Sequence, residues 1–489
     1  MKITELKPTL VWESFDALTQ IPRPSGHTEK VAKYLVKFAK ENGCKAKIDA
    51  AGNVIMQVPA TKGMEDRQMV VLQAHMDMVP QKTADSPHDF EKDPIETWID
   101  GEWVRAKNTT LGADDGMGVA AAMAIIKDKK AKHGPLEVLI TRDEETGMFG
   151  AFALKAGELK SKLMLNLDSE TMGELTIGCA GGVDINAVMK YKETDQCMFD
   201  DDDLVAFRIS IGGLLGGHSG LEINQGRANA NKLMARVLFA TVNTGLAQLC
   251  NWHGGNMRNA IPRDSDALVI VPRKKVRSFK LMVGKCQKTF QAEYKDIEKV
   301  AVEVRIEEVD MPKKVIPESI QENIINAVMA AQDGVLRYIP TLPEVVETSV
   351  NLSIINVEKG KVEIAMLARS ATDSMKQYLA NQLVACFSMA GMKVKLSGAY
   401  SGWQPNPGSP LLKLMEKTYK KMFGEPAKVL VVHAGLECGI FAPKYPDMDM
   451  VSLGPTLLSP HTPNERCYIP SVETFYNYVV EVLKNVPKK

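Results

Sequence analysis

Short apolar runs alternate with helical stretches in the first third of the chain, and this rhythm constrains the fold more than any other feature. Residues 69–74, 136–141 and 163–167 are almost unbroken apolar runs, as in strands buried on both faces. Residues 28–42 carry apolar side chains at helical spacing, and 116–127 form an alanine-rich stretch typical of a buried helix. The sequence therefore predicts an α/β fold, with a mixed, largely parallel sheet sandwiched by helices.

This rhythm changes near Gly181 and returns after Gly398. In between, amphipathic helices alternate with strand-like stretches at 205–211, 267–271, 302–306, 349–355, 361–368 and 393–397. The short apolar runs at 429–432 and 450–453 resemble those of the first third. We therefore predict a split first domain, residues 1–185 and 399–489, with an inserted α+β domain of residues 186–398.

The composition excludes several classes of protein. The 489 residues include 60 basic and 60 acidic side chains, whereas a nucleic-acid-binding protein usually has a basic excess. No run of about 20 apolar residues is present, so we expect no membrane-spanning helix. Charged side chains occur among the first residues, so we expect no signal peptide. The eight scattered cysteines favour reduced thiols in a cytoplasmic protein. The charge run at 200–203 is expected to form a solvated turn.

Histidine and aspartate concentrate where the apolar runs end, and sites in open α/β sheets form beyond the carboxyl ends of strands. His75 and Asp77 end the first run and would point to the same face, where a carboxylate can orient a histidine ligand. Asp114 and Asp115 precede the alanine-rich stretch. This pair could simply cap a helix, or it could supply a bridging metal ligand.

Acidic residues also follow the next two runs. Glu144 and Glu145 would repel each other at a buried strand end unless a cation or a shared proton intervened. One could bind metal while the other acts as general base, although a solvated turn explains the pair equally well. Asp168 ends the third run, and His461 lies in the returning part of the first domain. Each segment alone is weak evidence, and only the combination favours a site.

Together the five segments supply two histidines and several carboxylates. These ligands suit zinc, manganese or cobalt better than calcium or a metal that prefers thiolates. Two such ions would lie about 3.5–4 Å apart and activate a shared water. The glycine-rich segment 212–219 nearly fits a phosphate-binding loop, but His218 stands where that loop requires lysine. We expect this segment to present a histidine to a ligand instead.

In the same order along the chain, the five segments resemble motifs of the co-catalytic zinc peptidases related to carnosinase, carboxypeptidase G and peptidase T. The motifs are His-Met-Asp at 75–77, Gly-Ala-Asp-Asp-Gly-Met-Gly at 112–118, Asp-Glu-Glu-Thr-Gly at 143–147, Asn-Leu-Asp at 166–168 and Ser-Pro-His at 459–461. Segments 216–220 and 433–441 extend the likeness to the bacterial dipeptidases of this family. The resemblance implies the zinc peptidase fold, with the split domain catalytic and the inserted domain a lid.

The resemblance also implies a role for each residue of the metal site. Asp114 would bridge two divalent ions, most simply Zn²⁺, for which Co²⁺ or Mn²⁺ could substitute. His75 and Asp168 would complete one metal site, and Glu145 and His461 would complete the other. Two further residues would take part in catalysis: Glu144 as general acid/base and Asp77 as the partner that orients His75.

The resemblance places the substrate contacts mainly in the lid. His218 would stabilise the oxyanion and Asn259 would contact the substrate, with the backbone of Gly435 as a further contact. Arg369 would bind the substrate's carboxylate. Arg258 and Arg263, which lie close to Asn259 in the sequence, remain alternatives for that contact.

The leading hypothesis is a metal-dependent dipeptidase that acts on small peptides, including Xaa-His, as a monomer or homodimer. A hydroxide held between the two metal ions would attack the peptide carbonyl, and Glu144 would transfer the proton. A related aminoacylase or tripeptidase is the alternative, because the metal site does not set specificity. A catalytically silent binding or scaffold protein is a remote alternative. Nucleic-acid and membrane partners are not expected.

Overall fold

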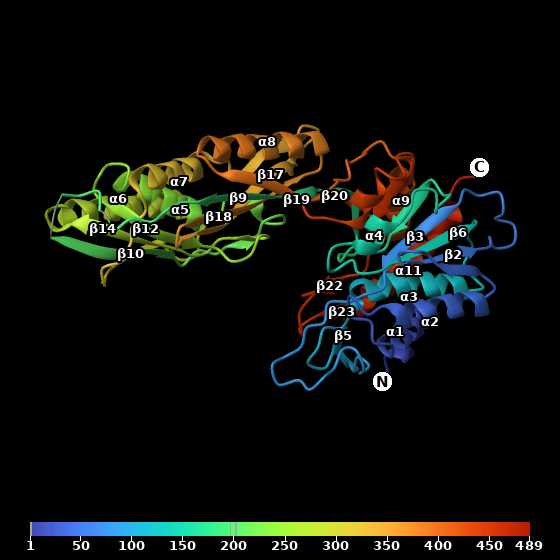
Figure 1. Cartoon of the computed structure of the whole chain (residues 1–489). Coiled ribbons are helices and arrows are strands. Elements are labelled where there is room, and N and C mark those ends of the chain that lie inside the picture. Colours follow the sequence, from blue (N-terminus) through green and yellow to red (C-terminus); the bar gives the residue numbers. More distant parts are fainter. Residues whose placement is uncertain (1, 196, 201–202) are drawn as a thin grey trace. The chain divides into compact units, whose positions relative to one another are not determined.

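Figure 1 shows the computed structural model, which describes residues 2–195, 197–200 and 203–489. The chain divides into two compact units. Unit 1 comprises Met1–Gly178, Trp403–Val431 and Leu436–Lys489, and unit 2 comprises Cys179–Gly402 and Val432–Gly435. Two residues of the predicted solvated turn, 201 and 202, lie outside the described residues.

The unit boundaries differ from the predicted domain boundaries of 185/186 and 398/399. Unit 2 begins at Cys179 because strand β9 (Gly181–Lys190) pairs along its whole length with β18 (Lys361–Ser370) of the same unit. The short segment Val432–Gly435 also belongs to unit 2, whereas the sequence pattern assigned it to the split domain. Gly435 therefore lies in unit 2.

Unit 1 is built on an eight-stranded sheet with the order β1-β2-β6-β3-β7-β21-β8-β20. Its strands are β1 (Lys45–Ile48), β2 (Val54–Val58), β3 (Val70–His75), β6 (Leu136–Thr141), β7 (Leu163–Asn166), β8 (Glu174–Cys179), β20 (Lys428–Val432) and β21 (Asp449–Ser452). Pairing is parallel from β6 through β3 and β7 to β21, and antiparallel at β1, β2 and β8. The predicted mixed α/β sheet is confirmed, with the parallel strands at its centre.

Helices cover this sheet and share one apolar core with it (Figure 1). They are α1 (Thr9–Thr19), α2 (Glu29–Glu41), α3 (Ala113–Lys127), α9 (Pro410–Phe423) and α11 (Ile469–Asn485). Two short helices of the same unit, α4 (Phe149–Ala153) and α10 (Glu437–Phe441), pack against each other. Helix α3 packs against α1 and β3 and is buried on nearly every side. Its alanines and glycines permit this, because small side chains let neighbouring elements approach closely.

A smaller four-stranded sheet completes unit 1, with the order β22-β23-β5-β4. It contains β4 (Thr97–Asp100), β5 (Trp103–Ala106), β22 (Leu457–Leu458) and β23 (Arg466–Tyr468). This sheet joins the chain near residue 100 to the chain near residue 466. It therefore holds the C-terminal motif that contains His461 within the same unit as the other predicted ligands.

Unit 2 is built on a nine-stranded antiparallel sheet, ordered β15-β10-β14-β12-β17-β18-β9-β19, with β16 paired to β17. Besides β9 and β18, its strands are β10 (Leu204–Gly212), β12 (Gln248–Gly254), β14 (Ser265–Pro272), β15 (Glu303–Val309), β16 (Gly334–Ile339), β17 (Leu342–Glu358) and β19 (Lys393–Tyr400). Helices α5 (Ala230–Thr241), α6 (Val276–Tyr294), α7 (Glu318–Ala330) and α8 (Asp373–Met389) pack against it around a second apolar core (Figure 1). A two-stranded ribbon joins β11 (Gly217–His218) to β13 (Ala260–Ile261).

Among the residues that the structure describes, no helix combines the length and the apolar character needed to cross a bilayer. The eight cysteines all lie among the described residues, and none forms a disulfide bond.

Candidate active site

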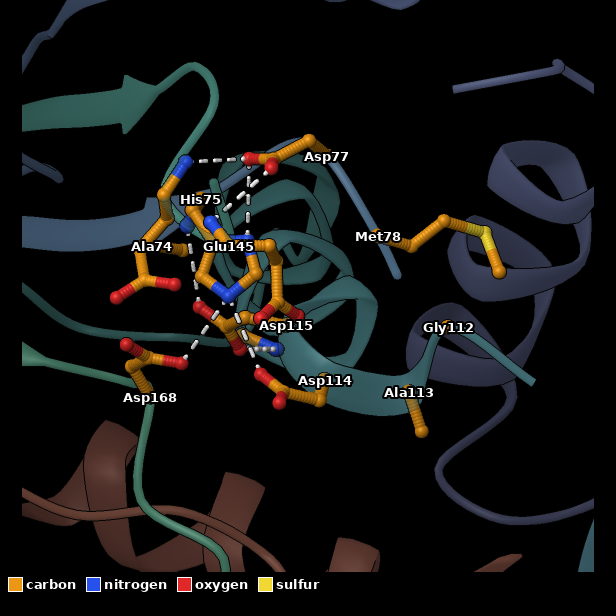
Figure 2. A network of polar contacts seen from close by, with 12 residues as sticks. Ala74, His75, Asp77, Met78, Gly112, Ala113, Asp114, Asp115, Glu145 and Asp168 are labelled. Carbon is orange, nitrogen blue, oxygen red and sulfur yellow. Dashed lines mark hydrogen bonds and ion pairs between the residues drawn. The ribbon is translucent and has the colours of Figure 1, made fainter. Parts of the chain in front are cut away.

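Three parallel strands of unit 1 end at one edge of the sheet, and the predicted ligands follow those ends. His75 is the last residue of β3, Asp168 comes two residues after β7, and Glu145 comes four residues after β6. Because the carboxyl ends of neighbouring parallel strands gather at one edge, these side chains meet. Figure 2 shows them converging, together with Asp114 from the start of α3.

His75 faces two carboxylates. Its Nε2 lies 3.1 Å from Oδ1 of Asp114 and 3.4 Å from Oδ1 of Asp168, and its side chain is only 1% exposed. Burial disfavours a charged ring, but the charge of Asp168 and the hydrogen bond with Asp114 outweigh it and raise the pKa of His75 well above its usual value. This ring therefore lies where the surroundings favour positive charge.

Asp114 faces a second histidine with its other oxygen. Oδ2 lies 3.0 Å from Nε2 of His461, and that nitrogen lies 3.0 Å from Oε2 of Glu145. Hydrogen bonds with Asp114 and then with Glu145 raise the pKa of His461 to about 11. Burial opposes the ionisation of Asp114, but its hydrogen bonds with His461 and His75 lower its pKa nonetheless. Asp114 thus directs one carboxylate oxygen towards each histidine.

This arrangement fits two cations. The ligand atoms of His75, Asp114 and Asp168 lie within 4.8 Å of one another, and so do those of Asp114, Glu145 and His461. Oε1 of Glu145 is buried without a hydrogen-bond partner among the described residues, and a buried polar atom without a partner calls for a ligand. Imidazole nitrogens combined with carboxylate oxygens are donors that zinc, cobalt and manganese accept.

Asp77 lies behind His75 and connects two loops. Its Oδ1 is 3.4 Å from Nδ1 of His75 and accepts a hydrogen bond from the backbone N–H of Glu144 at 3.0 Å. Its Oδ2 accepts from Ser25 Oγ at 2.7 Å and from the Glu145 backbone N–H at 3.3 Å. Burial opposes its ionisation, but the hydrogen bond with His75 and the charge of that ring lower the pKa of Asp77. Asp77 therefore links His75 to the loop that carries the two glutamates.

Glu144 lies beside the ligands and has an unusual environment. One of its carboxylate oxygens lies within 4.8 Å of ligand atoms of His75 and Glu145. Desolvation raises the pKa of Glu144 well above its usual value, His75 opposes this, and repulsion from Asp168 and Glu437 adds to the rise. A carboxyl group of raised pKa beside the ligands is suited to accepting a proton and returning it.

The two aspartates before α3 have different partners. Asp115 is 3% exposed, and its oxygens accept hydrogen bonds from the backbone N–H groups of His75 at 3.2 Å and Gly118 at 3.0 Å. It therefore caps the helix and ties it to β3. The sequence left capping and metal binding open for this pair; Asp115 caps the helix, whereas Asp114 faces His75 and His461.

His218 lies in unit 2, on the ribbon strand β11. Its Nδ1 accepts hydrogen bonds from the backbone N–H groups of Gly220 at 3.2 Å and Leu221 at 3.0 Å. In the neutral ring the proton is therefore on Nε2, which becomes a donor. Burial and then the charge of Arg369 lower the pKa of His218, so the ring is neutral at neutral pH.

The other substrate residues predicted from sequence also belong to unit 2. Asn259 lies beside His218, because its backbone oxygen accepts a hydrogen bond from the N–H of Ser219 at 2.8 Å. Arg369 lies on β18 and is only 6% exposed, close enough for its charge to affect His218. Gly435 is the last residue of the segment Val432–Gly435.

The candidate arginines differ in how far their donors are engaged. Arg258 donates to Oδ1 of Asn186 at 2.7 Å and pairs with Asp184 at 3.5 Å, and Arg263 donates to a backbone oxygen. Arg369 lies 3.3 Å from the hydroxyl of Tyr400, and its buried Nε has no partner among the described residues. Arg258 is therefore the most engaged of the three arginines, and Arg369 differs from Arg263 in having a buried Nε without a partner among the described residues.

One functional candidate in unit 2 was not singled out from the sequence. His433 is 7% exposed, its Nε2 lies 2.7 Å from Oγ of Ser349, and burial followed by the charge of Arg369 lowers its pKa to about 3. A Cβ on Gly220 would collide with the backbone oxygen of His433, so only glycine permits this approach. The His-Ala-Gly segment at 433–435 could have drawn attention to His433. Its partner, Ser349, is distant in sequence, so the contact could not be foreseen.

Two buried carboxyl groups of unit 1 were also missed. Oε2 of Glu437 accepts hydrogen bonds from Nε2 of Gln73 at 2.5 Å and from Oγ1 of Thr141 at 2.6 Å, and Gln73 in turn accepts one from Asn166 at 2.5 Å. These three residues belong to β3, β6 and β7, so Glu437 supports the strands that carry the ligands. The second group, Glu465, binds the backbone of the loop before Asp114.

Comparisons with known proteins identify the family of this chain. Residues 71–485 match the peptidase family M20/M25/M40. The cytosol non-specific dipeptidase of Escherichia coli (strain K12) is 42% identical over 489 residues, which cover all of both chains. The solved structure of an aminoacylhistidine dipeptidase from Vibrio alginolyticus is 41% identical, covers 100% of this chain and 99% of its own, and has a TM-score of 0.93.

A more distant structure shows the fold alone. The aminopeptidase PepT from Bacillus cereus is 17% identical, with a TM-score of 0.58 over 98% of this chain and 99% of its own. The resemblance to zinc peptidases that was inferred from five short motifs is confirmed by the full-length matches. The chain belongs to the peptidase family M20/M25/M40 and is a peptidase.

Proposed function

We propose that this peptidase is a metal-dependent dipeptidase of broad specificity that includes Xaa-His substrates. The observation that carries the proposal is Asp114, whose two oxygens face His75 and His461 separately. The names of the full-length relatives, a cytosol non-specific dipeptidase and an aminoacylhistidine dipeptidase, support this substrate class and a cytoplasmic location.

Two divalent ions would be held by the residues of unit 1. His75, Asp168 and Asp114 would bind one ion, and Asp114, Glu145 and His461 would bind the other. Zn²⁺ is the ion we propose, with Co²⁺ or Mn²⁺ able to replace it, because the donors are imidazole and carboxylate groups. When bound, the ions would polarise the scissile carbonyl and lower the pKa of a water molecule.

Glu144 would transfer the proton in the reaction. Its raised pKa favours accepting a proton from the attacking water and returning it to the leaving amine. Asp77 would hold the ring of His75 in place and, through the backbone of Glu144, fix the base relative to that ligand.

Residues of unit 2 would bind the substrate. A neutral His218 would donate from Nε2 to the oxygen on which negative charge develops. Arg369 would bind the carboxylate of the dipeptide through its unengaged donors, and Asn259 and Gly435 would make further contacts. The active form would be a monomer or a homodimer.

A panel of substrates with chelator and metal add-back tests the proposal. Dipeptides, tripeptides and N-acyl amino acids would be compared before chelation, after chelation and after addition of Zn²⁺, Co²⁺ or Mn²⁺. We expect hydrolysis of dipeptides, including Xaa-His, that chelation abolishes and metal restores. A strong preference for N-acyl amino acids or tripeptides would contradict the dipeptidase assignment, and unchanged activity in chelator would contradict metal dependence.

A further inference from the structure

Glu465 makes an unusual set of contacts beside the candidate metal site. It is only 2% exposed, and its carboxylate accepts hydrogen bonds from four consecutive backbone N–H groups, those of residues 111–114. Oε2 accepts from Leu111 at 2.8 Å and from Gly112 at 3.1 Å. Oε1 accepts from Ala113 at 2.7 Å and from Asp114 at 3.3 Å. Both oxygens are thus fully engaged with the loop that ends in Asp114.

The local backbone explains why four amides can point to one carboxylate. Gly112 has a φ of 69°, in the left-handed region that glycine adopts readily, and this turns successive N–H groups to one side. The amides include the first ones of α3, which have no partner within the helix. The guanidinium of Arg23 binds the Gly112 carbonyl oxygen at 2.5 Å, and its charge partly offsets the buried charge of Glu465.

Glu465 belongs to the same loop as His461. The loop is closed by hydrogen bonds from the Glu465 backbone N–H to the Thr462 oxygen at 3.0 Å and from Thr462 Oγ1 to the Ser459 oxygen at 2.8 Å. His461 itself has a φ of 60°, which is uncommon for a residue other than glycine and persists only where the surroundings hold it. The carboxylate of Glu465 therefore joins two loops, one carrying His461 and the other carrying Asp114.

We propose that Glu465 is a positioning residue that fixes the spacing between Asp114 and His461 and thereby maintains the metal ion that these two residues share with Glu145. This inference rests on the proposed two-ion site. The ion held by His75 and Asp168 depends on Glu465 less, because both of these ligands follow strands of the central sheet. Loss of the Glu465 carboxylate should therefore weaken one ion more than the other.

The test must separate this role from ordinary stabilisation of the fold, and Glu137 provides a matched control. Glu137 is 1% exposed, and its Oε2 accepts hydrogen bonds from the backbone N–H groups of Lys160 at 2.9 Å and Ser161 at 3.0 Å. It lies near the amino end of β6, the end opposite to the ligands. A change at Glu137 removes the same kind of contact without affecting the ligand loops.

We would measure zinc stoichiometry and affinity by metal analysis and competitive chelator titration for wild type, Glu465→Gln and Glu137→Gln. The side-chain amide introduced by Glu465→Gln would turn an NH₂ donor towards two backbone N–H donors, so the loop loses two hydrogen bonds. We expect two ions in wild type and in Glu137→Gln. In Glu465→Gln, we expect about 10–100-fold weaker binding of one ion and little change in the other. Melting temperatures of the metal-free proteins should fall for both variants.

Two ions bound to Glu465→Gln with wild-type affinities would overturn the inference. Equal weakening of both ions, or the same loss in Glu137→Gln, would also overturn it, because the effect would then be general. Fewer than two ions in wild type would instead contradict the proposed two-ion site. If Glu465→Gln does not fold, Glu465→Asp retains the charge but shortens the reach, and the same selective loss is expected.

Discussion

The site histidines of unit 1 and unit 2 have opposite electrostatic surroundings. In unit 1, carboxylates raise the pKa values of His75 and His461 despite burial. In unit 2, burial and then the charge of Arg369 lower the pKa values of His218 and His433. One residue type is thus surrounded by groups that attract cations in one unit and by groups that favour a neutral ring in the other.

The difference in the surroundings of these histidines indicates what each unit is suited to bind. A histidine among carboxylates is a site for a metal ion, which can replace the proton on the ring. A neutral histidine near an arginine is a hydrogen-bond donor for an anion or a developing oxyanion. Under the proposed mechanism, activation of water in unit 1 and stabilisation of negative charge by unit 2 would therefore respond separately to mutation.

The largest effect should come from unit 1, in the variant Glu144→Gln. We expect kcat to fall about 10²–10⁴-fold, because Gln cannot accept a proton while its size and hydrogen bonds are similar. The measurement is steady-state kinetics on a dipeptide, with metal content and melting temperature as controls. Loss of metal together with activity would contradict the role of Glu144 as a base, because Glu144 would then act as a metal ligand.

The next effect should come from unit 2, in His218→Ala. We expect a fall in kcat of about 10²–10³-fold with metal content unchanged, as for loss of one oxyanion donor. His218→Gln, which keeps a neutral N–H donor, should recover part of the loss. His253→Ala, on β12 of the same unit, is the control. An effect of His218→Ala on zinc binding would contradict the separation between the two units.

A smaller effect is expected for Arg369→Met. Removal of a charged hydrogen-bond donor typically weakens binding by about 1.5–3 kcal/mol, so KM should rise about 10–100-fold while kcat changes less. Arg263→Met is the matched control, since this arginine donates to the backbone oxygen of Leu214. A dipeptide amide, which lacks the carboxylate, should bind wild type and Arg369→Met equally. A preserved preference for the free acid in the variant would assign the contact to another residue.

The smallest expected effect tests whether burial sets the pKa of a carboxyl group in unit 2. Burial raises the pKa of Asp333 to about 6, against hydrogen bonds from Leu352 and Asn229 that oppose the rise. The folded state therefore holds this proton more tightly than the unfolded chain, whose aspartate pKa is about 4. Wild type should lose stability relative to Asp333→Asn as pH rises from about 4 to about 6.5, by on the order of 3 kcal/mol.

Urea unfolding of wild type and Asp333→Asn at each pH measures this change, and subtraction cancels the titration of the other groups. The offset between the two proteins at a single pH is irrelevant, because the amide also changes local hydrogen bonds. A difference that stays constant across this range would show that Asp333 titrates normally, and that burial does not control this group.

Much of unit 1 was predictable because its central strands are buried on both faces. The run 136–141 coincides with β6, and the run 163–167 extends one residue beyond β7. Such strands must be almost entirely apolar, so their sequence is unambiguous. The sequence did not indicate that Val432–Gly435 belongs to unit 2, because this segment directly continues the apolar run of β20. Ser349, the partner of His433, is distant in sequence.

The site residues that lie closest to strand ends were the easiest to predict. His75 and Asp168 follow from the rule that sites form beyond the carboxyl ends of parallel strands. His461 drew its weight only from the other four segments, because a lone histidine is weak evidence by itself. Glu437 and Glu465 escaped because their partners are backbone N–H groups or single polar side chains on other elements. Contacts of this kind leave no spacing pattern in the sequence.

Unit 2 is not encoded by one continuous stretch of sequence, because Val432–Gly435 belongs to it. A gene fragment that encoded residues 179–402 would not encode all of unit 2, because it would lack the four residues Val432–Gly435 at the end of β20 and just after it. Ser349 would then lose the ring of His433, which lies 2.7 Å from its hydroxyl. Exchange of this unit between related enzymes by recombination must therefore transfer two pieces of sequence, and the shorter piece carries one of the histidines whose ring is kept neutral.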